Sequence, residues 1–417
     1  MITGTARNGM LYAVRRRQSA VAYCALSIRC GTRDEEGFHP GIAHFTEHTL
    51  FKGTTRKRAA TINSYLDKLG GELNAYTTKE EIVLHATVLK EDLRKACSLL
   101  MELASRPTFP PEEIETERGV VIDEIQSVKD NPADDIFDRF EELLFEGHPL
   151  SGLILGTVDS VRRITSEELL RFVRTYFQPQ RMAFTVVADV DEVRFGKVID
   201  RLAETFFGAP SAPVPPLAGQ APDDPRHYFL PRARRIDRTE EKKNHEVNVV
   251  IGSLAPSLYE AQDRITTILL GNLLAGPASN TILNEVLRER HGWVYGVESA
   301  YTQYLDTGSL TISLGCDRDN LEKCLTAIRK EILKLQTVPL TPARLKAAQK
   351  QLLGQLAIAS DNGEAQCLSM GKSLLAYGRI DPQTEIRRQI EAVTAEDIRT
   401  LARRIFHPDR TAKLVYL

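Results

Sequence analysis

The sequence has no long apolar run and no excess of charge of either sign. No stretch of its 417 residues approaches the roughly 18–20 uncharged apolar residues of a membrane-spanning helix. Its first residues contain neither an apolar signal core nor the Arg- and Ser-rich start of a transit peptide, so we expect a cytoplasmic protein. Because 54 Lys and Arg residues balance 56 Asp and Glu residues, no electrostatic argument favours nucleic acid or an anionic membrane as a partner.

Cysteine is scarce and scattered. None of the six cysteines forms a C-x-x-C pair, which excludes a thiolate zinc knuckle and a thioredoxin-like redox site. Scattered cysteines in apolar contexts are usually small buried hydrophobic residues, and free thiols fit a reducing compartment. Hydrophobic residues make up 42% of the chain, which is enough for ordinary cores and too much for intrinsic disorder.

A Pro-rich stretch divides the chain into two nearly equal halves. From Ala209 to Pro225 the sequence reads APSAPVPPLAGQAPDDP, and its closely spaced prolines exclude a helix or a central strand. We therefore expect a domain at 1–208, a linker at 209–236 and a second domain at 237–417. The cluster of arginines that follows the prolines is typical of a solvated edge.

Both halves show the same order of elements. The first half predicts strands and helices at 21–28, 41–51, 60–69, 72–88, 91–106 and 111–129, with an exposed hairpin turn at the three arginines 15–17. The second half repeats this order at 247–252, 263–274, 310–314, 321–335 and from 342 onward. Gly276 lies 223 residues after Gly53, and Pro342 lies 231 residues after Pro111. So small a drift predicts two copies of one α+β domain.

A candidate metal-binding motif lies in the first half, in the segment His44-Phe-Thr-Glu47-His48. On a helix, His44 and His48 are one turn apart and project from the same face. Two neutral imidazoles so placed can bind zinc at about 2.0–2.1 Å each. Glu47 lies on the same side, within reach of a water on the metal. The alternative is a helix that carries two histidines by chance.

A third ligand is needed, because catalytic zinc usually has three protein ligands and a water. The helix after Pro111 offers Glu117 and Glu124, which are seven residues apart and therefore share one face. Val121 and Val128 lie on the same stripe, and burying carboxylates on such a face is costly unless a cation compensates them.

H-x-x-E-H is the inverzincin signature, and with a glutamate 76 residues after the second histidine the chain resembles the pitrilysin/insulysin family, in its mitochondrial processing peptidase-like branch. The similarity extends through Gly-Gly-Glu-Leu-Asn74-Ala75-Tyr76-Thr and Leu-Arg288-Glu-Arg-His-Gly-Trp-Val-Tyr295-Gly. It implies two homologous α/β domains of the LuxS/mitochondrial-processing-peptidase-like metallohydrolase type.

The resemblance also implies a role for each site residue. Glu124 corresponds to the third ligand of one zinc ion per chain. Glu117 corresponds to an acid that does not bind the metal but orients a histidine ligand through a hydrogen bond. Glu47 becomes the general base that takes a proton from the zinc-activated water. The metal identity is itself inferred, since the same ligands accept manganese or cobalt.

Further site residues also follow from the resemblance. Asn74, Ala75 and Tyr76 correspond to the family's edge strand, which pairs with extended substrate. In the second half, Thr267, Leu270 and Gly271 stand where the first half has His44, Glu47 and His48, so no second zinc is expected. Arg288 and Tyr295 instead correspond to a pair that reaches the substrate and the developing oxyanion.

The function expected on this basis is zinc-dependent hydrolysis of peptide bonds in unfolded polypeptides or oligopeptides. One alternative is a non-catalytic scaffold or assembly subunit of the same fold, and another is a non-proteolytic zinc hydrolase.

Larger relatives join four such domains in one polypeptide, and two-domain relatives pair subunits. Because this chain carries both residue sets, we expect a homodimer with shared active sites, against the alternative of a monomer.

Overall fold

The structure is a computed structural model that describes residues 1–219, 231–242 and 245–417, and within these residues the chain forms two compact units. Unit 1 takes its residues from Met1–Gln126, Gly152–Asp223 and Ile358–Ile380, and unit 2 from Ser127–Ser151, Asp224–Ala357 and Asp381–Leu417. Each half of the sequence therefore contributes one segment to the other unit. The compact units thus differ from the contiguous ranges 1–208 and 237–417, because two long helices, α4 (Pro111–Asp130) and α11 (Pro342–Ala359), each extend past a unit boundary.

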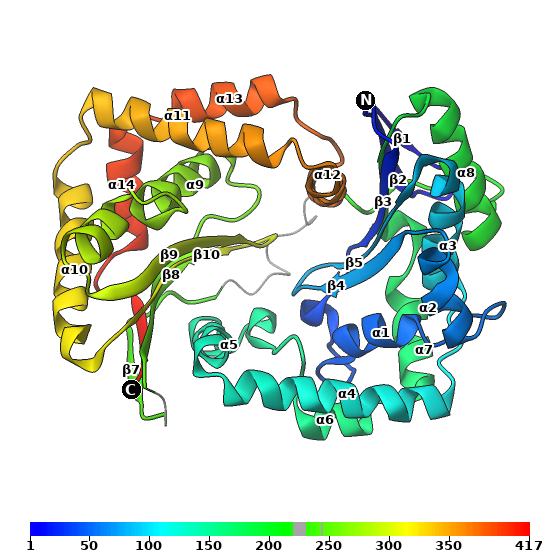
Figure 1. The fold of residues 1–417 in the computed structure, drawn as a ribbon, viewed down its shortest axis with the longest axis horizontal. Coiled ribbons are helices and arrows are strands. Elements are labelled where there is room, and N and C mark those ends of the chain that lie inside the picture. The colour runs from blue at the N-terminus through cyan, green and yellow to red at the C-terminus, as the bar shows by residue number, and fades with distance from the viewer. Residues whose placement is uncertain (220–230, 243–244) are drawn as a thin grey trace. The chain divides into compact units, whose positions relative to one another are not determined.

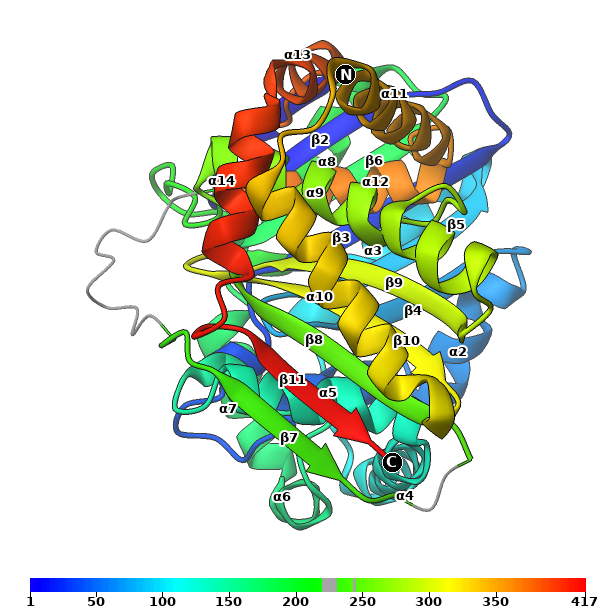
Figure 2. The same cartoon turned by 90° about the vertical axis from the view of Figure 1, so that its left-hand side faces the viewer.

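Each unit is built on one mixed sheet. The first sheet has the order β1-β2-β6-β3-β5-β4, with strands Ile2–Thr5 (β1), Leu11–Arg16 (β2), Val21–Ile28 (β3), Glu72–Thr77 (β4), Ile82–Leu89 (β5) and Met182–Ala188 (β6). The second sheet has the order β7-β11-β8-β10-β9, which can be followed in Figure 2, with strands Ile236–Glu240 (β7), Val247–Ala255 (β8), Val294–Gln303 (β9), Gly308–Cys316 (β10) and Ala412–Tyr416 (β11).

The two sheets share one topology. In each, a single parallel pair, β2 with β6 or β7 with β11, is followed by antiparallel neighbours out to the edge strand, β4 or β9. The duplication inferred from the sequence is therefore visible in the strand order. The expected hairpin at residues 15–17 is wrong, because β6 is inserted between β2 and β3, and two of those arginines belong to β2 itself.

Helices cover both faces of the first sheet. Figure 1 shows α3 and α8 on one face and α12 on the other, where α12 lies against β3 and β6. This explains why every residue of β6 is buried. The helices of unit 1 are α1 (Ile42–Leu50), α2 (Ala59–Asp67), α3 (Leu93–Ser105), most of α4, α6 (Val158–Arg163), α7 (Ser166–Tyr176), α8 (Glu192–Phe207) and α12 (Gly363–Tyr377).

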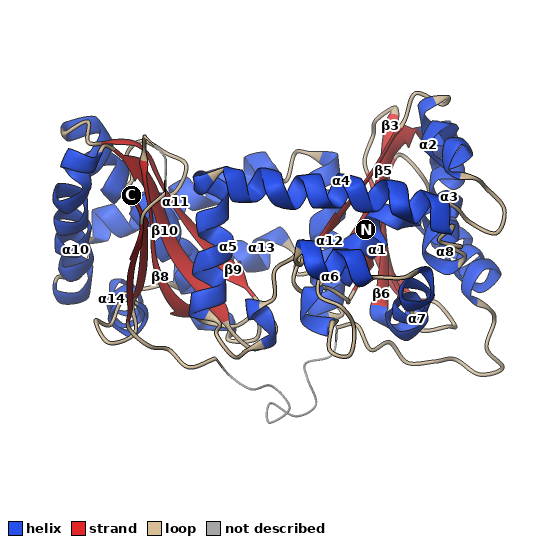
Figure 3. Cartoon of the chain, turned by 90° about the horizontal axis from the view of Figure 1, so that it is seen from below, coloured by secondary structure: helices blue, strands red, loops and turns tan. Residues whose placement is uncertain are grey.

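The second sheet is covered in the same way, with α5 and α10 on opposite faces in Figure 3. Two separate hydrophobic cores result, one on each side of the sheet. The helices of unit 2 are α5 (Pro132–Leu144), α9 (Ala261–Ala275), a π-helical segment (Asn284–Arg290), α10 (Leu321–Thr337), most of α11, α13 (Gln383–Ala392) and α14 (Ala395–Ile405).

The Pro-rich linker predicted at 209–236 is described only in part. Its residues 209–219 and 231–235 lie outside helices and strands, and residues 220–230 of the expected linker lie outside the described residues. The part before the gap rests on unit 1, since the Leu217 and Ala218 N–H groups both donate to the Gln180 carbonyl at 2.7 Å. Among the described residues, no helix is long and apolar enough to cross a membrane.

Candidate metal centre

The helix α1 presents His44 and His48 side by side. All residues of α1 except His48 are buried, so the helix is packed against its neighbours on most of its surface. Its polar side chains therefore lie in the protein interior. The two imidazole rings lie one helical turn apart, with their centroids 4.5 Å from one another. The spacing of four residues thus produces the common face that the sequence predicted.

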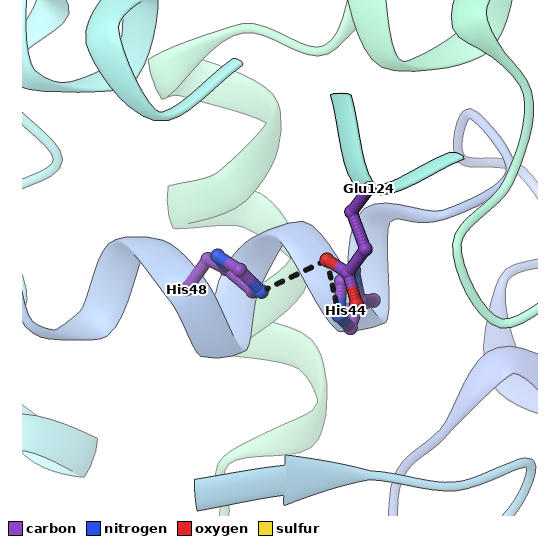
Figure 4. A group of neighbouring side chains, drawn as sticks. All are labelled: His44, His48 and Glu124. Carbon is purple, nitrogen blue, oxygen red and sulfur yellow. Dashed lines mark ion pairs between the residues drawn. The ribbon is translucent and has the colours of Figure 1, made fainter. Parts of the chain in front are cut away.

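Glu124 reaches this pair from α4. Its Oε2 lies 3.6 Å from His48 Nε2 and 3.8 Å from His44 Nε2, and Figure 4 shows the carboxylate directed at both rings. Among the described residues, this trio is the one group of His, Cys, Asp or Glu side chains whose ligand atoms converge closely enough to hold a metal ion. Ligand atoms of a tetrahedral zinc ion are about 3.3 Å apart, and the three atoms here all lie within 4.8 Å of one another.

The exposure of the three side chains differs. His44 is 8% exposed and His48 is 21% exposed, whereas Glu124 is 42% exposed. The expectation of two buried carboxylates on α4 therefore applies to Glu117 alone. The exposed Glu124 side chain leaves the group of three accessible from one side, and an open side is a property of catalytic rather than structural zinc sites.

Glu117 fixes the orientation of the His48 ring. Its Oε1 lies 2.8 Å from His48 Nδ1, and its Oε2 lies 2.5 Å from Lys52 Nζ. The His48 Nδ1–H donates to the carboxylate, so Nε2, which faces Glu124, is the ring atom that can bind a metal ion once its own proton is lost. Burial alone would lower the pKa of His48, but the hydrogen bond to Glu117 and the nearby carboxylates raise it.

His44 has a different environment. Its Nδ1 is buried and has no hydrogen-bond partner within the described part of the chain. Burial, together with the neighbouring His48, lowers the pKa of His44 to about 3, so the imidazole is neutral at physiological pH. A neutral imidazole is the form that binds a metal ion.

Glu47 lies on the same helix and is 9% exposed. Its Oε2 accepts a hydrogen bond from the Thr77 hydroxyl at 3.0 Å. Burial raises the pKa of Glu47, while His48 and Thr77 lower it and Glu124 raises it further. A carboxylate whose pKa is raised toward neutral pH is a better proton acceptor than an ordinary one.

The strand β4 forms the edge of the first sheet, next to α1. Its Asn74, Ala75 and Tyr76 pair with His85, Leu84 and Val83 of β5, respectively, and none of the described strands pairs with its other side. Asn74 is exposed, and burial raises the pKa of Tyr76. This places a free strand edge beside the helix that carries the histidines.

His85 is not a member of the metal group. Its Nδ1 instead lies 3.0 Å from Glu364 Oε1 of α12. Sequence reasoning missed two contacts of the site, those of Lys52 and Thr77. Lys52 could have been predicted, because it follows His48 at the helical spacing of four residues. Thr77 could be suspected only because it directly follows the Asn74–Tyr76 segment.

The second unit carries Arg288 and Tyr295. Arg288 lies in the π-helical segment, and Tyr295 lies on the edge strand β9 with 66% of its surface exposed. The Tyr295 hydroxyl donates a hydrogen bond to Asp317 Oδ1 at 3.0 Å. In α9, Thr267, Leu270 and Gly271 are all buried and supply no metal ligands.

Two family descriptions match this chain in sequence. Residues 11–158 match "Insulinase (Peptidase family M16)", and residues 163–352 match "Peptidase M16 inactive domain". Together the two matches cover residues of both units. The chain belongs to peptidase family M16. The resemblance to the pitrilysin/insulysin family is thereby confirmed.

The sequence similarity to individual M16 relatives extends over most of the chain. An uncharacterized zinc protease of Streptomyces coelicolor is 29% identical over 89% of this chain and 80% of its own length. An uncharacterized zinc protease of Bacillus subtilis is 28% identical over 93% of this chain and 91% of its own length. The M16 description of the second half as inactive agrees with the absence of ligands from α9.

Solved structures have the same M16 fold. A protease from Helicobacter pylori superimposes with a TM-score of 0.87 over 100% of this chain and 99% of its own, at 20% identity. A Pseudomonas fluorescens structure described as a peptidase M16 inactive domain gives 0.87 over 100% and 97%, at 19% identity. The expected architecture of two related α/β domains is therefore confirmed.

Proposed function

We propose that this M16 chain is a zinc-dependent peptidase that hydrolyses peptide bonds in unfolded polypeptides or oligopeptides. The observation that carries the proposal is the convergence of His44 Nε2, His48 Nε2 and Glu124 Oε2, with Glu47 on the same helix. The relatives' description as zinc proteases supports the choice of metal and of reaction.

The donor set fits one zinc ion per chain. Two neutral imidazoles and one carboxylate are the ligands of a known class of catalytic zinc site. The hydrogen bond from His48 Nδ1–H to Glu117 leaves His48 Nε2 available for the metal, and the low pKa of His44 keeps its ring in the neutral form that a metal binds. When bound, zinc supplies a Lewis acid that activates water near neutral pH and polarises the carbonyl of the peptide bond.

Glu47 is proposed to be the general base. Its carboxylate takes a proton from the attacking water and later delivers it to the leaving amine. The Thr77 hydrogen bond holds one carboxylate oxygen, so the other remains available for the water. Burial favours this transfer, because it raises the pKa of Glu47 and makes its carboxylate more basic.

The free edge of β4 is proposed to bind the substrate. An extended peptide that adds to Asn74, Ala75 and Tyr76 forms main-chain hydrogen bonds, which do not depend on the side chains of the substrate. Recognition of this kind requires an unfolded segment. It predicts loose sequence preference.

Arg288 and Tyr295 are proposed to complete the site from a second copy of the chain, in a homodimer with shared active sites. The ligands and this pair belong to different units of the fold, and one chain carries both sets. The test is to mix Glu47→Gln chains with Tyr295→Phe chains, each inactive alone. Activity returns in heterodimers if sites are shared. If subunit exchange is verified and no activity returns, shared sites are excluded.

The proposed reaction is tested with Glu47→Gln. The amide preserves the shape of the side chain and cannot accept the proton, so the variant should retain zinc and lose cleavage of a fluorogenic peptide. A scaffold subunit would show no cleavage in the unaltered protein either. Near-normal turnover in the variant would exclude Glu47 as the base.

All six cysteines are free and buried, which fits the cytoplasm as the proposed location.

A further inference from the structure

The first turn of α1 lacks a capping side chain of its own. Its N-cap residue is Gly41, with φ +88°, and no N-cap side chain accepts a hydrogen bond from the helix. A Cβ at Gly41 would lie 2.6 Å from the Leu155 carbonyl oxygen, so Ser, Asp or Asn cannot stand there. The first N–H groups of a helix nevertheless need acceptors, and burial keeps water away from these.

Glu35 supplies the missing acceptors from outside the helix. Its Oε2 accepts from the Gly41 N–H and its Oε1 accepts from the Ala43 N–H, both at 2.9 Å. The side chain is deeply buried, with 9% of the residue exposed. Burial raises the pKa of Glu35 to about 8, although the two backbone hydrogen bonds and the charge of Lys79 lower it.

The next residue along the chain after Ala43 is His44. The two histidines differ in what holds their rings, because Glu117 holds His48 whereas His44 Nδ1 has no hydrogen-bond partner among the described residues. The position of the His44 ring therefore depends on the backbone of the first turn. That backbone is fixed at Ala43 by Glu35.

We propose that Glu35 is a positioning residue, whose buried carboxyl group caps α1 through both of its oxygens and thereby sets the position of His44 and of the Glu47 that follows on the same helix. The inference deepens the proposed function, since it concerns the helix that carries the proposed site. Its central test, however, requires neither zinc nor activity.

The test compares Glu35→Gln with Glu102→Gln. Glu102 is another buried glutamate of unit 1, 2% exposed against 9% for Glu35. It accepts a hydrogen bond from Thr54 Oγ1 at 2.7 Å and pairs with Lys57, away from the first turn of α1. In the metal-free protein, Glu35→Gln should accelerate amide hydrogen exchange in residues 41–46 on the order of tenfold, because a lost cap weakens the first turn. Glu102→Gln should leave exchange in those residues unchanged.

Two further measurements separate positioning from general stability. Glu35→Gln should weaken zinc binding on the order of tenfold and lower kcat with little change in KM, because the β4 edge is untouched. Glu35→Asp, which keeps both oxygens, should restore part of each loss and replaces Glu35→Gln if the latter does not fold. The proposal is overturned if Glu35→Gln lowers the unfolding temperature while exchange at 41–46 and zinc affinity stay unchanged. It is also overturned if Glu102→Gln produces the same changes. Wild-type protein without zinc affinity would refute the proposed function and leave the exchange result valid.

Discussion

Removal of the Glu117 carboxylate should weaken zinc binding without removing a ligand. In the structure this carboxylate is 10% exposed and holds His48 Nδ1 at 2.8 Å and Lys52 Nζ at 2.5 Å. Glu117→Ala leaves the ring free to rotate and leaves the Lys52 ammonium without this carboxylate. Replacing such a partner of a histidine ligand typically costs 10–100-fold in metal affinity.

The two substitutions Glu117→Gln and Glu117→Ala should weaken zinc binding by different amounts. Glu117→Gln keeps an oxygen that accepts from His48 Nδ1 but loses the charge that Lys52 faces, so we expect a loss of about tenfold. Glu117→Ala loses both contacts, and we expect about 100-fold, equivalent to about 2.7 kcal/mol of binding free energy. Competition with a chromophoric zinc chelator at pH 7.5 measures both values.

A matched control lies in the same unit. Glu364→Gln removes the charge of a carboxylate that holds His85 Nδ1 at 3.0 Å, so it alters the same kind of pair away from the metal group. This variant should bind zinc as the unaltered protein does. If Glu117→Ala binds zinc with unaltered affinity, or if Glu364→Gln weakens it equally, the reasoning about His48 is refuted.

Three further predictions concern the ligands, the base and the second unit. His48→Ala should lose zinc in elemental analysis while His85→Ala retains it, and equal retention would argue against His48 as a ligand. Thr77→Val should move the acidic limb of the kcat/KM profile to higher pH, because loss of the Thr77 hydrogen bond raises the pKa of Glu47 further. Glu47 can accept a proton only when it is ionised, which is above its pKa. An unmoved limb would exclude Glu47 as its origin. Tyr295→Phe should lower kcat about 10²–10³-fold if the phenol stabilises the oxyanion, and a change confined to KM would assign Tyr295 to substrate binding alone.

Much of the fold follows from local sequence signals. The prolines 111 and 342 begin long helices as predicted, because proline is favoured in the first turn of a helix. The strand at 21–28 has the predicted bounds, since a run of β-branched and apolar residues is buried on both faces. The strand-like stretch 72–88 is two antiparallel strands, separated by a polar turn at 78–81.

The exchange of helices between the halves could not be read from the sequence. α12 covers the first sheet, where Gly363 and Gly371 allow close approach to Tyr23 and Ser27. Nothing in its own periodicity distinguishes the sheet of one half from that of the other. The position of β6 between β2 and β3 was missed for a similar reason, because long-range strand order is not encoded locally.

The candidate site was predictable in its helical part. A spacing of four residues for His44 and His48 is sufficient to place both rings on one face, and the seven-residue spacing of Glu117 and Glu124 orients α4. The roles of the two glutamates were not separable by spacing alone. Their different burial, which follows from the packing of α4, distinguishes them in the structure.

The central claim is that this chain cleaves peptide bonds with a zinc ion held by His44, His48 and Glu124. The most direct measurement is hydrolysis of an internally quenched, unstructured peptide by the protein as purified, after removal of metal by a chelator, and after addition of one equivalent of zinc. The account predicts cleavage that disappears with the metal and returns with zinc. Cleavage that persists after complete removal of the metal, or a zinc-loaded protein that cleaves no peptide, would contradict it.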